Sequence, residues 1–200
     1  MSKRIRPHVN PLSIMKEISF TGFENNNPIT VDVGAANGEF SFDLLEKFGN
    51  AKNFILFEIR PKIYQRLLKK FADYKNVRVF DGNAGQNFES ILKPSIDRGV
   101  LIEEIFINFP DPHFKERHKK RRFINSVFLK KCAEYIPAET RWIFQTDQKF
   151  LFNETLEVLE ESEFSNISFF PSSPYGIQTE WEKVKMEEKA EIFRMEFRKD

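Results

Sequence analysis

Short apolar runs rich in β-branched and aromatic residues alternate along this chain with segments whose apolar residues recur every three or four positions. The first pattern predicts strands and the second predicts amphipathic helices. Strands are expected at residues 29–33, 53–58, 77–80, 103–109 and 141–145. Helices are expected between them, with apolar faces along Phe40 to Phe48, Ile63 to Phe71, residues 86–98, Ile124 to Ile136 and Leu151 to Leu159. This alternation predicts an α/β fold with right-handed crossovers and a mostly parallel sheet.

The two ends of the chain depart from this alternation. Two late strands are expected at about 166–170 and 190–198, and the segment between them is interpreted as a loop that includes residues 179–182. Residues 1–28 show no long periodic element. We therefore expect a single domain over residues 29–200, preceded by a flexible basic arm over residues 1–28.

Each of the first five predicted strands ends at or beside a carboxylate or amide side chain. These residues are Asp32, Glu58, Asn83, Asp111 and Asp147. Ligands of parallel α/β sheets bind outside the carboxyl ends of the strands, where the strand order reverses. A single acid at such a position is often a helix cap or a turn residue, but five polar groups along one edge predict a binding site.

The loop after the first strand, Gly34-Ala35-Ala36-Asn37-Gly38, resembles a glycine-rich nucleotide loop without matching G-x-G-x-x-G in full. Small residues here also serve tight helix–strand packing. Glu58 follows Gly34 by 24 residues, close to the spacing of about 20 for an acid that binds ribose hydroxyls. NAD would need glycines where Ala36 and Glu39 stand, whereas S-adenosylmethionine has no phosphate, is cationic and tolerates an acidic rim. We therefore favour S-adenosylmethionine as the cofactor.

Asp111 lies between Pro110 and Pro112, which fix their own φ angles and favour extended conformations in the residues before them. This predicts a rigid acidic corner. Six Lys or Arg side chains and two histidines follow within residues 113–122. Such a run is usually a solvated helix start, but this one leaves from the predicted cofactor edge, where phosphate contacts would position a nucleic acid. His113 and His118 have no third ligand at a metal-binding spacing, so no metal is expected.

The composition limits the class of protein. The chain has 200 residues, a net charge of +1 and 40% hydrophobic residues, values typical of one globular domain without overall basicity. Cys132 is the sole cysteine, so no disulfide or cysteine metal site can form within one chain. No apolar stretch reaches roughly 18 residues, and the N-terminus lacks a signal peptide's apolar region, so a cytoplasmic protein is expected. The basic residues of the arm, interpreted as a solvated tail or an RNA contact, are Lys3, Arg4 and Arg6.

Three motifs resemble the bacterial tRNA (guanine-N7-)-methyltransferase family. Residues 108–122, Asn-Phe-Pro-Asp-Pro-His-Phe-Lys-Glu-Arg-His-Lys-Lys-Arg-Arg, resemble its signature D-P-W-x-K-x-R-H-x-K-R-R. Residues 179–182 resemble its T-E-Y-E, and residues 145–147 its T-D. The resemblance covers about residue 29 to the end. It implies a Rossmann-like class I methyltransferase with a mostly parallel seven-stranded sheet, helices on both faces and an antiparallel last strand, using S-adenosylmethionine to methylate the variable-loop guanine of tRNA.

The resemblance also implies a role for each matching residue. Cofactor positions are matched by Asp32, Gly34, Glu58, Asn83 and Asp111, the last of which also falls on the position of the catalytic acid. Substrate-binding positions are matched by Lys115, Asp147, Thr179, Glu180, Trp181 and Glu182. The tRNA contact is matched by Arg117, His118, Lys119, Lys120, Arg121 and Arg122. Three residues depart from the family pattern: His113 replaces a Trp, Ala36 a loop Gly and Asn83 a usual Asp.

Guanine N7 has a free lone pair, so its methylation depends on orientation and charge stabilisation rather than on a strong general base. Asp111 and Asp147 are the candidates for stabilising the cationic product. N7 is inaccessible in an A-form helix, so the target must lie in a loop or be extruded. Two other function classes stay open at this point: a methyltransferase acting on another RNA or a small molecule, and a non-catalytic RNA-binding protein. A monomer or weak homodimer is expected.

Overall fold

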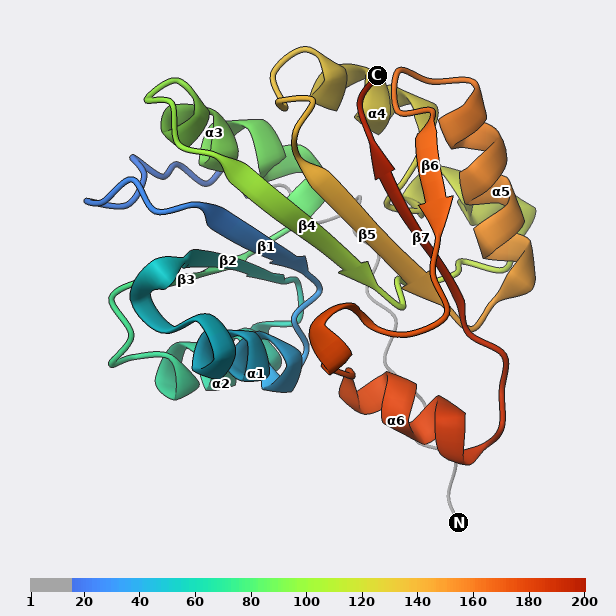
Figure 1. Ribbon diagram of the computed structural model, residues 1–200, viewed down its shortest axis with the longest axis horizontal. Coiled ribbons are helices and arrows are strands. Elements are labelled where there is room, and N and C mark those ends of the chain that lie inside the picture. The colour runs from blue at the N-terminus through green and yellow to red at the C-terminus, as the bar shows by residue number, and fades with distance from the viewer. Residues whose placement is uncertain (1–15) are drawn as a thin grey trace.

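The computed structural model of the protein describes residues 16–200, so the basic residues at positions 3, 4 and 6 lie outside the described part. Seven strands form one sheet in the order β3-β2-β1-β4-β5-β7-β6 (Figure 1). Their bounds are β1 Ile29–Val33, β2 Asn53–Glu58, β3 Val77–Asp81, β4 Ile102–Asn108, β5 Arg141–Thr146, β6 Asn166–Phe169 and β7 Phe193–Arg198.

Strand directions agree with the sequence-based prediction. The pairs from β3 through β5 are parallel, and β7 runs antiparallel to both β5 and β6. The mostly parallel sheet with an antiparallel last strand is therefore confirmed. β2 is buried along its whole length, because a central strand of a parallel sheet has helices on both faces, whereas β6 at the edge is mostly exposed.

Six α-helices lie within residues 16–200. Their bounds are α1 Glu39–Phe48, α2 Pro61–Lys70, α3 Ala84–Ile96, α4 Ser126–Ala133, α5 Lys149–Glu160 and α6 Glu180–Glu187. Short 3-10 turns lie at η2 Gly49–Ala51, η3 Glu116–Arg121 and η4 Pro174–Gly176. Helices α3, α4 and α5 cover one face of the sheet, and α1, α2 and α6 lie on the other side (Figure 1).

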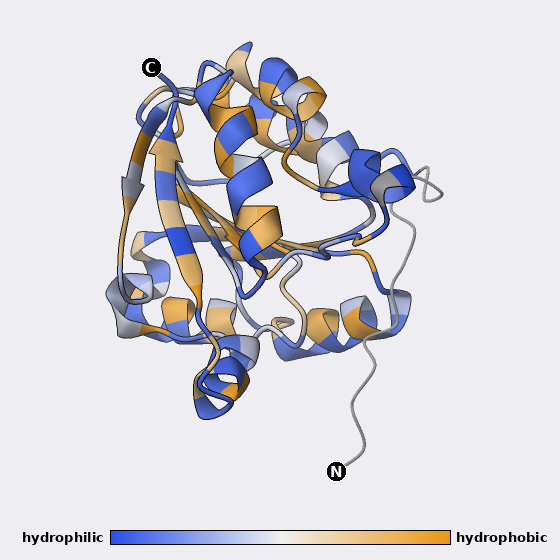
Figure 2. Cartoon of the chain, turned by 90° about the vertical axis from the view of Figure 1, so that its right-hand side faces the viewer, coloured by the Kyte–Doolittle hydropathy of each residue, from blue (hydrophilic) through white to orange (hydrophobic). Residues whose placement is uncertain are grey.

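Each face of the sheet has its own hydrophobic core. Phe88 of α3, Phe128 of α4 and Trp142 of β5 belong to one cluster, and Leu44 of α1 and Leu67 of α2 belong to the other. Hydrophobic residues gather on the strands and on the inner sides of the helices, while the outer helix surfaces are mostly hydrophilic (Figure 2). The two layers hold the strands rigidly, and so they also fix the positions of the loops that follow the strands.

Residues 16–28, which the sequence groups with the N-terminal arm, pack against the domain. Phe23 is 2% exposed and belongs to the core cluster on the α3 side of the sheet. The Ile18 amide donates a hydrogen bond to Oδ1 of Asn87 at 2.8 Å, and Arg98 donates to the Phe23 carbonyl at 2.8 Å. This segment is therefore continuous with the packing of the sheet.

The segment between β6 and β7 is not a loop throughout, and the prediction of a loop was wrong for residues 180–187. The Thr179 hydroxyl accepts a hydrogen bond from the Glu182 amide at 3.0 Å, and the Glu182 carboxylate accepts one from the Thr179 amide at 3.4 Å. This reciprocal capping box begins α6. The T-x-x-E spacing is the signal from which the helix could have been predicted.

The helix predicted over residues 124–136 is shorter than expected. Asn125 caps α4, because its side chain accepts a hydrogen bond from the Phe128 amide at 3.0 Å. The basic residues before it form the separate turn η3 and are not the first turn of α4. The expectation that these residues start the following helix was therefore wrong, whereas most of their side chains are exposed to solvent as expected.

Candidate active site

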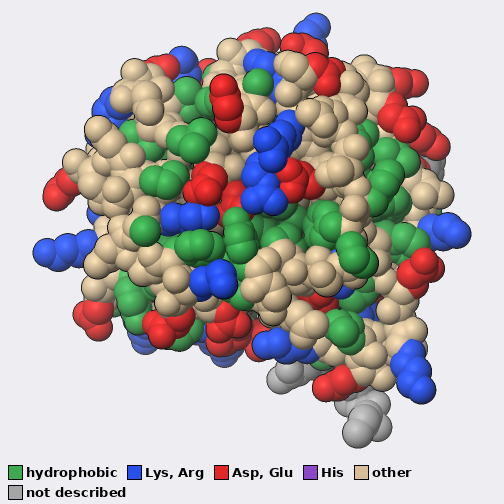
Figure 3. All heavy atoms as spheres, viewed as in Figure 1, with side chains coloured by type: hydrophobic (Ala, Val, Ile, Leu, Met, Phe, Trp, Pro, Cys, Tyr) green, Lys and Arg blue, Asp and Glu red, His purple; other side chains and the backbone are tan. Residues whose placement is uncertain are grey.

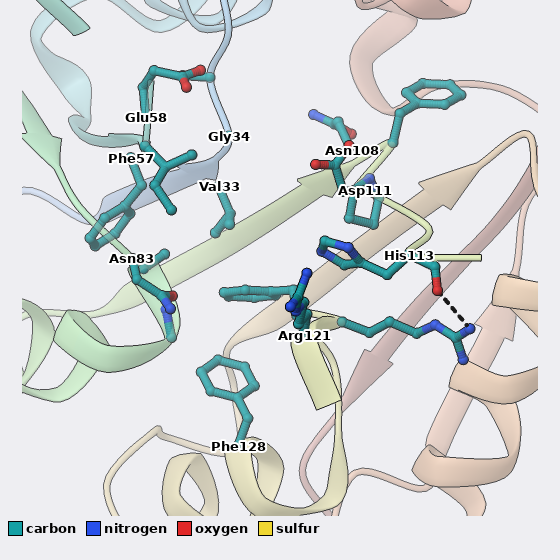
Figure 4. Close-up of a pocket in the computed structure, with 18 of the residues that line it drawn as sticks. Val33, Gly34, Phe57, Glu58, Asn83, Asn108, Asp111, His113, Arg121 and Phe128 are labelled. Carbon is teal, nitrogen blue, oxygen red and sulfur yellow. Dashed lines mark hydrogen bonds between the residues drawn. The ribbon is translucent and has the colours of Figure 1, made fainter. Parts of the chain in front are cut away.

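A cleft of about 1090 Å³ opens at the carboxyl ends of β1, β2, β3 and β4. β1 and β4 are neighbours in the sheet although β2 and β3 lie between them in the sequence, so the strand order reverses at this point. Figure 4 shows Gly34, Glu58 and Asn83 on one side of the cleft, facing Asp111 and His113 on the other. The sheet edge thus brings together residues that are far apart in the sequence.

The loop between β1 and α1 needs unusual backbone conformations. Gly34, Ala36 and Gly38 have φ angles of 81°, 51° and 73°. A Cβ atom on Gly38 would lie 2.6 Å from Cδ2 of Leu67, so only glycine lets α1 pack this closely on α2. Ala36 takes a left-handed conformation that favours glycine, at a cost of about 1–2 kcal/mol.

Glu58 joins the loops that follow β1 and β2. Its carboxylate is 2% exposed and accepts hydrogen bonds from the Ala36 amide at 3.1 Å and from the Arg60 amide at 2.8 Å. The Arg60 guanidinium lies 2.7 Å from the same carboxylate. The hydrogen bond to Glu58 is the main reason that the pKa of Arg60 is raised, and the charge of Asp111 contributes less.

Arg60 lines the cleft and was missed by the sequence analysis. The signal that could have identified it is its place two residues after the acid at the end of β2. Its charge compensates Glu58, which would otherwise be a buried anion with no cation beside it.

Asp32 is buried at the end of β1. It is 4% exposed, and it accepts a hydrogen bond from the Ser41 hydroxyl at 2.5 Å. Burial raises the pKa of Asp32 to about 6; the Ser41 hydrogen bond opposes this effect, and the charge of Glu58 adds to it. A cation bound in the cleft would favour the charged form of Asp32.

Asn83 is the N-cap of α3. Its Oδ1 atom accepts a hydrogen bond from the Gly85 amide at 2.9 Å, and the residue also lines the cleft. Asn is as good an N-cap as Asp, so the replacement of a usual acid keeps the helix start intact and removes one negative charge from the cleft.

The corner that carries Asp111 is built on two left-handed residues. Phe109 and His113 have φ angles of 48° and 45°. The expectation that the residue before Pro110 is extended was therefore wrong for Phe109. Its side chain is 6% exposed and its amide donates to the Gln145 carbonyl of β5 at 2.8 Å, so burial and this hydrogen bond outweigh the local preference. This bend turns Asp111 into the wall of the cleft.

Most cations of the basic run are exposed, and several line the cleft. Exposed side chains are those of Lys115, Arg117, Lys119 and Lys120. Arg117, Lys119, Lys120, Arg121 and Arg122 line the cleft, whereas Lys115 and His118 do not. Desolvation and the charges of Arg121, Arg117 and Lys115 lower the pKa of His118.

Arg122 is the exception in the run, because it is 6% exposed. Its guanidinium donates hydrogen bonds to the Pro112 carbonyl at 3.0 Å and to the His113 carbonyl at 3.3 Å, the second drawn as a dashed line in Figure 4. It also forms an ion pair with Glu154 of α5. Arg122 therefore ties the Asp111 corner to the helix layer.

Helix α6 closes the cleft from the other side. The Asn37 side chain of the glycine-rich loop donates a hydrogen bond to Oε2 of Glu180 at 3.0 Å. Thr179, Glu180 and Trp181 all line the cleft. Lys185 lies 4.8 Å from the centre of the Trp181 ring and 3.3 Å from Oδ2 of Asp147. Asp147 is thus linked to the cleft through Lys185 and Trp181, although it does not line it.

Glu182 is turned away from the cleft. It is 0% exposed, lies 2.6 Å from the Arg194 guanidinium of β7 and accepts a hydrogen bond from Ser173. Arg194 also donates to Oε1 of Gln145 at 3.2 Å. This buried network fixes the start of α6 to β5 and β7.

The face of the molecule seen in Figure 3 carries charges of both signs. On this face, Lys and Arg side chains are interspersed with Asp and Glu side chains. Among residues 16–200, no group of three or more His, Cys, Asp or Glu side chains could hold a metal ion. A search of the same residues found no helix with the length and apolarity needed to cross a membrane.

The strand order and the cleft between β1 and β4 define a Rossmann-like class I methyltransferase fold. A solved structure of human methyltransferase-like protein 13 in complex with SAH has the same fold, with a TM-score of 0.54 and 14% sequence identity over 86% of this chain and 72% of that chain. A family model described as "Putative methyltransferase" matches residues 26–195.

Relatives with higher sequence identity to this chain share the name of one specific methyltransferase. The chain is 32% identical over 215 residues to the tRNA (guanine-N(7)-)-methyltransferase of Prochlorococcus marinus subsp. pastoris, covering 98% of this chain and 100% of that protein. It is 35% identical over 144 residues to the protein of the same name from Clostridium novyi, covering 71% of this chain and 64% of that protein. The chain belongs to the tRNA (guanine-N7-)-methyltransferase family.

Proposed function

We propose that this protein is a tRNA (guanine-N7-)-methyltransferase that transfers a methyl group from S-adenosylmethionine to N7 of the variable-loop guanine. The observation that carries the proposal is the single cleft in which buried carboxylates face Asp111 and a row of cations. Family membership with full-length coverage supports it. The reaction takes place in the cytoplasm with its tRNA substrate. A monomer or weak homodimer carries it out, with a single domain that comprises residues 29–200 and the segment 16–28 that packs against them.

The cofactor half of the cleft fits a cationic nucleoside. When bound, S-adenosylmethionine supplies an electrophilic methyl group on its sulfonium. Asp32 and Glu58 offer buried carboxylates, and the loop at Gly34 offers a close backbone approach. Asn83 offers a polar amide without charge. The loop after β1 lacks the full G-x-G-x-x-G run that a pyrophosphate would need, and this agrees with a ligand that has no phosphate.

Asp111 is proposed as the catalytic carboxylate. It lines the cleft opposite Glu58 and Asn83, on a corner fixed by two prolines and by Arg122. As guanine N7 takes up a methyl group, positive charge develops on the purine, and a fixed carboxylate beside it stabilises that charge. Correct orientation of the base supplies the rest of the barrier reduction, because N7 carries a free lone pair and loses no proton.

The exposed cations are proposed to bind the tRNA backbone. Arg117, Lys119 and Lys120 line the cleft and are exposed to solvent, so they can contact phosphates on either side of an extruded guanine. Arg121 is half-buried at the same wall. Arg122 is better explained as a positioning residue, since its guanidinium is engaged with the corner and with Glu154.

Thr179, Glu180 and Trp181 are proposed to hold the guanine from the α6 side, because they line the cleft. Trp181 supplies an aromatic ring, and Glu180 can accept hydrogen bonds from base amino and imino groups. Lys115 contacts the substrate from outside the cleft, and Asp147 acts through Lys185. Glu182 contributes indirectly, because its buried pair with Arg194 holds α6 in place.

The decisive experiment is transfer of labelled methyl groups to an unmodified tRNA transcript, followed by mapping of N7-methylguanine by chemical cleavage. We expect cleavage at one guanine in the variable loop. Asp111→Ala should lower kcat about 100- to 1,000-fold, the range for losing one group that stabilises transition-state charge. Asp73→Ala, which removes an exposed acid outside the cleft, is the matched control and should retain activity.

Two results would reject the proposal. Methyl transfer to tRNA that maps to another base or atom would indicate a different RNA methyltransferase. Absence of transfer, combined with failure of tRNA to compete for a small-molecule acceptor, would indicate a small-molecule enzyme. Full activity of Asp111→Ala would remove Asp111 from the mechanism without changing the assignment of the substrate.

A further inference from the structure

Phe114 is the one aromatic side chain of residues 108–122 that is strongly exposed, at 66%, whereas Phe109 is 6% exposed. An isolated surface Phe needs no special explanation. This one follows Asp111 by three residues, and its neighbours include the exposed cations Lys115 and Arg117. The exposed Phe114 side chain therefore lies at the rim of the proposed RNA-binding surface.

The Phe114 ring packs on one side against the ring of Phe150. Its centre lies 5.4 Å from that of Phe150 in α5, with the two planes tilted by 41°. The Arg122 guanidinium lies 5.4 Å from the centre of the same Phe150 ring, and Arg122 is itself fixed by Glu154. The stack from Arg122 through Phe150 to Phe114 supports a ring whose outer side faces solvent.

We propose that Phe114 is a base-stacking platform for a nucleotide of the tRNA next to the reacting guanine. Exposed aromatic rings beside cations that track a phosphate backbone form the usual binding surface for single-stranded nucleic acid. Three residues of chain span about 11 Å at most, so the backbone of Phe114 lies within that distance of Asp111. Phe114 does not line the cleft that receives the guanine. Its partner is therefore a nucleotide close to the reacting guanine and not a distant part of the tRNA.

The surrounding charge favours RNA over a second copy of this chain as the occupant. Lys115 and Arg117, the two cations that follow Phe114 most closely in the sequence, are exposed, so a symmetric contact through Phe114 would bring like charges together. A polyanion gains from the same charges. The inference rests on the proposed tRNA substrate, and it adds Phe114 to the tRNA-binding residues as one that contacts a base by stacking.

The test compares dissociation constants for an unmodified tRNA transcript at several salt concentrations. Phe114→Ala should raise the dissociation constant about 5- to 150-fold, the range expected for one lost base stack. Its salt dependence should stay that of the wild type, because no phosphate contact is removed. Phe114→Trp should bind within about threefold of the wild type, since it keeps a π-face.

Phe169→Ala is the matched control. Phe169 is 62% exposed and also contacts an aromatic neighbour, with its ring centre 6.0 Å from that of Phe152, but it lies on β6 and is not part of the basic run. Its removal should leave the dissociation constant unchanged. S-adenosylmethionine affinity should be unchanged in all three variants, which reports that the fold and the cofactor half of the cleft are intact.

The outcomes separate this inference from the proposed function. If the wild type binds tRNA and Phe114→Ala binds it equally well, the platform is rejected and the proposed function stands. If Phe114→Ala instead changes the oligomeric state in sedimentation without changing tRNA affinity, the ring is a contact between copies and the platform is also rejected. If the wild type does not bind tRNA, both proposals fail together.

Discussion

The two sides of the cleft use charge in opposite ways. The acid wall, formed by Asp32 and Glu58, is almost completely buried, and both carboxylates are hydrogen-bonded to the protein. The basic segment, residues 115–122, presents most of its cations to solvent. One wall therefore acts in a confined space of low dielectric constant, and the other acts in water.

This difference matches the size of the two proposed ligands. A buried charge is costly, but its field on a small cation is strong, because neither water nor salt screens it. Exposed cations interact weakly one by one and gain affinity by contacting many phosphates. Arg122 lies in the basic segment but is buried like the acid wall. Comparing Arg122 with its exposed neighbours therefore shows what burial does to a charge when the sign of the charge stays the same.

The largest expected effect concerns Asp32 and pH. Its pKa is raised from 3.8 to about 6 in the folded protein. Between these values the folded state binds more protons than the unfolded state, so Asp32 makes stability fall as pH rises. The free energy of unfolding of Asp32→Asn, relative to the wild type, should therefore increase by about 3 kcal/mol between pH 3.5 and pH 7. Urea unfolding across that range measures it.

The pH dependence of S-adenosylmethionine binding provides the control for this prediction. If its cationic groups interact with Asp32, the wild type should bind it more tightly as pH rises through about 6, and Asp32→Asn should lose that trend. A stability difference between the two proteins that does not change with pH would contradict the assignment of the raised pKa.

A somewhat smaller effect is expected for Arg122→Ala. This change leaves Glu154 without its buried partner and removes two hydrogen bonds to backbone carbonyls, so it should lower the free energy of unfolding by about 2–3 kcal/mol. Methyl transfer should fall as well, because the Asp111 corner loses its anchor. Thermal unfolding and kcat measure the two losses. A variant with wild-type stability and a reduced salt dependence of tRNA binding would show instead that Arg122 contacts phosphate.

The smallest effect on stability is expected for Lys120→Ala, which should unfold within about 0.5 kcal/mol of the wild type. Its tRNA binding should weaken, and the slope of log affinity against log salt should decrease by about 0.7–0.9, as for one lost phosphate contact. Lys130→Ala removes an exposed lysine of α4 that does not line the cleft and should change neither quantity. Equal slopes for both variants would place Lys120 outside the tRNA contact.

The strands, their order of appearance and the polar residues at their ends could be predicted from the sequence. Burial on both faces makes β2 a continuous apolar run from Phe54 to Phe57, and Glu58 marks the end of that strand. β1 is a shorter β-rich run in which Asp32 lies next to the last residue, Val33. The parallel sheet follows from the alternation, and a parallel sheet places these ends on one edge. The cleft was therefore predictable as a place, and most of the residues predicted for the site line it.

Whether an individual charged side chain is buried and paired or exposed was not predictable in the same way. Arg122 and Lys120 look alike in sequence, and what separates them is Glu154, which lies 32 residues beyond Arg122 and packs against it only in the folded protein. Phe109 defies the local preference before proline for the same reason, since its partner lies in β5. Helix α6 was missed although a local signal existed, the capping box at Thr179 and Glu182.

The position of β7 has a consequence for how the protein is made. β7 lies between β5 and β6, so neither of these strands has its final neighbour until residues 193–198 have left the ribosome. Arg194, which holds the start of α6 through Glu182, arrives with the same strand. During synthesis the nascent chain must therefore carry two open strand edges, which are prone to pairing with other chains, beside a half-built cleft. Catalytic competence and protection from aggregation are gained in the same late step.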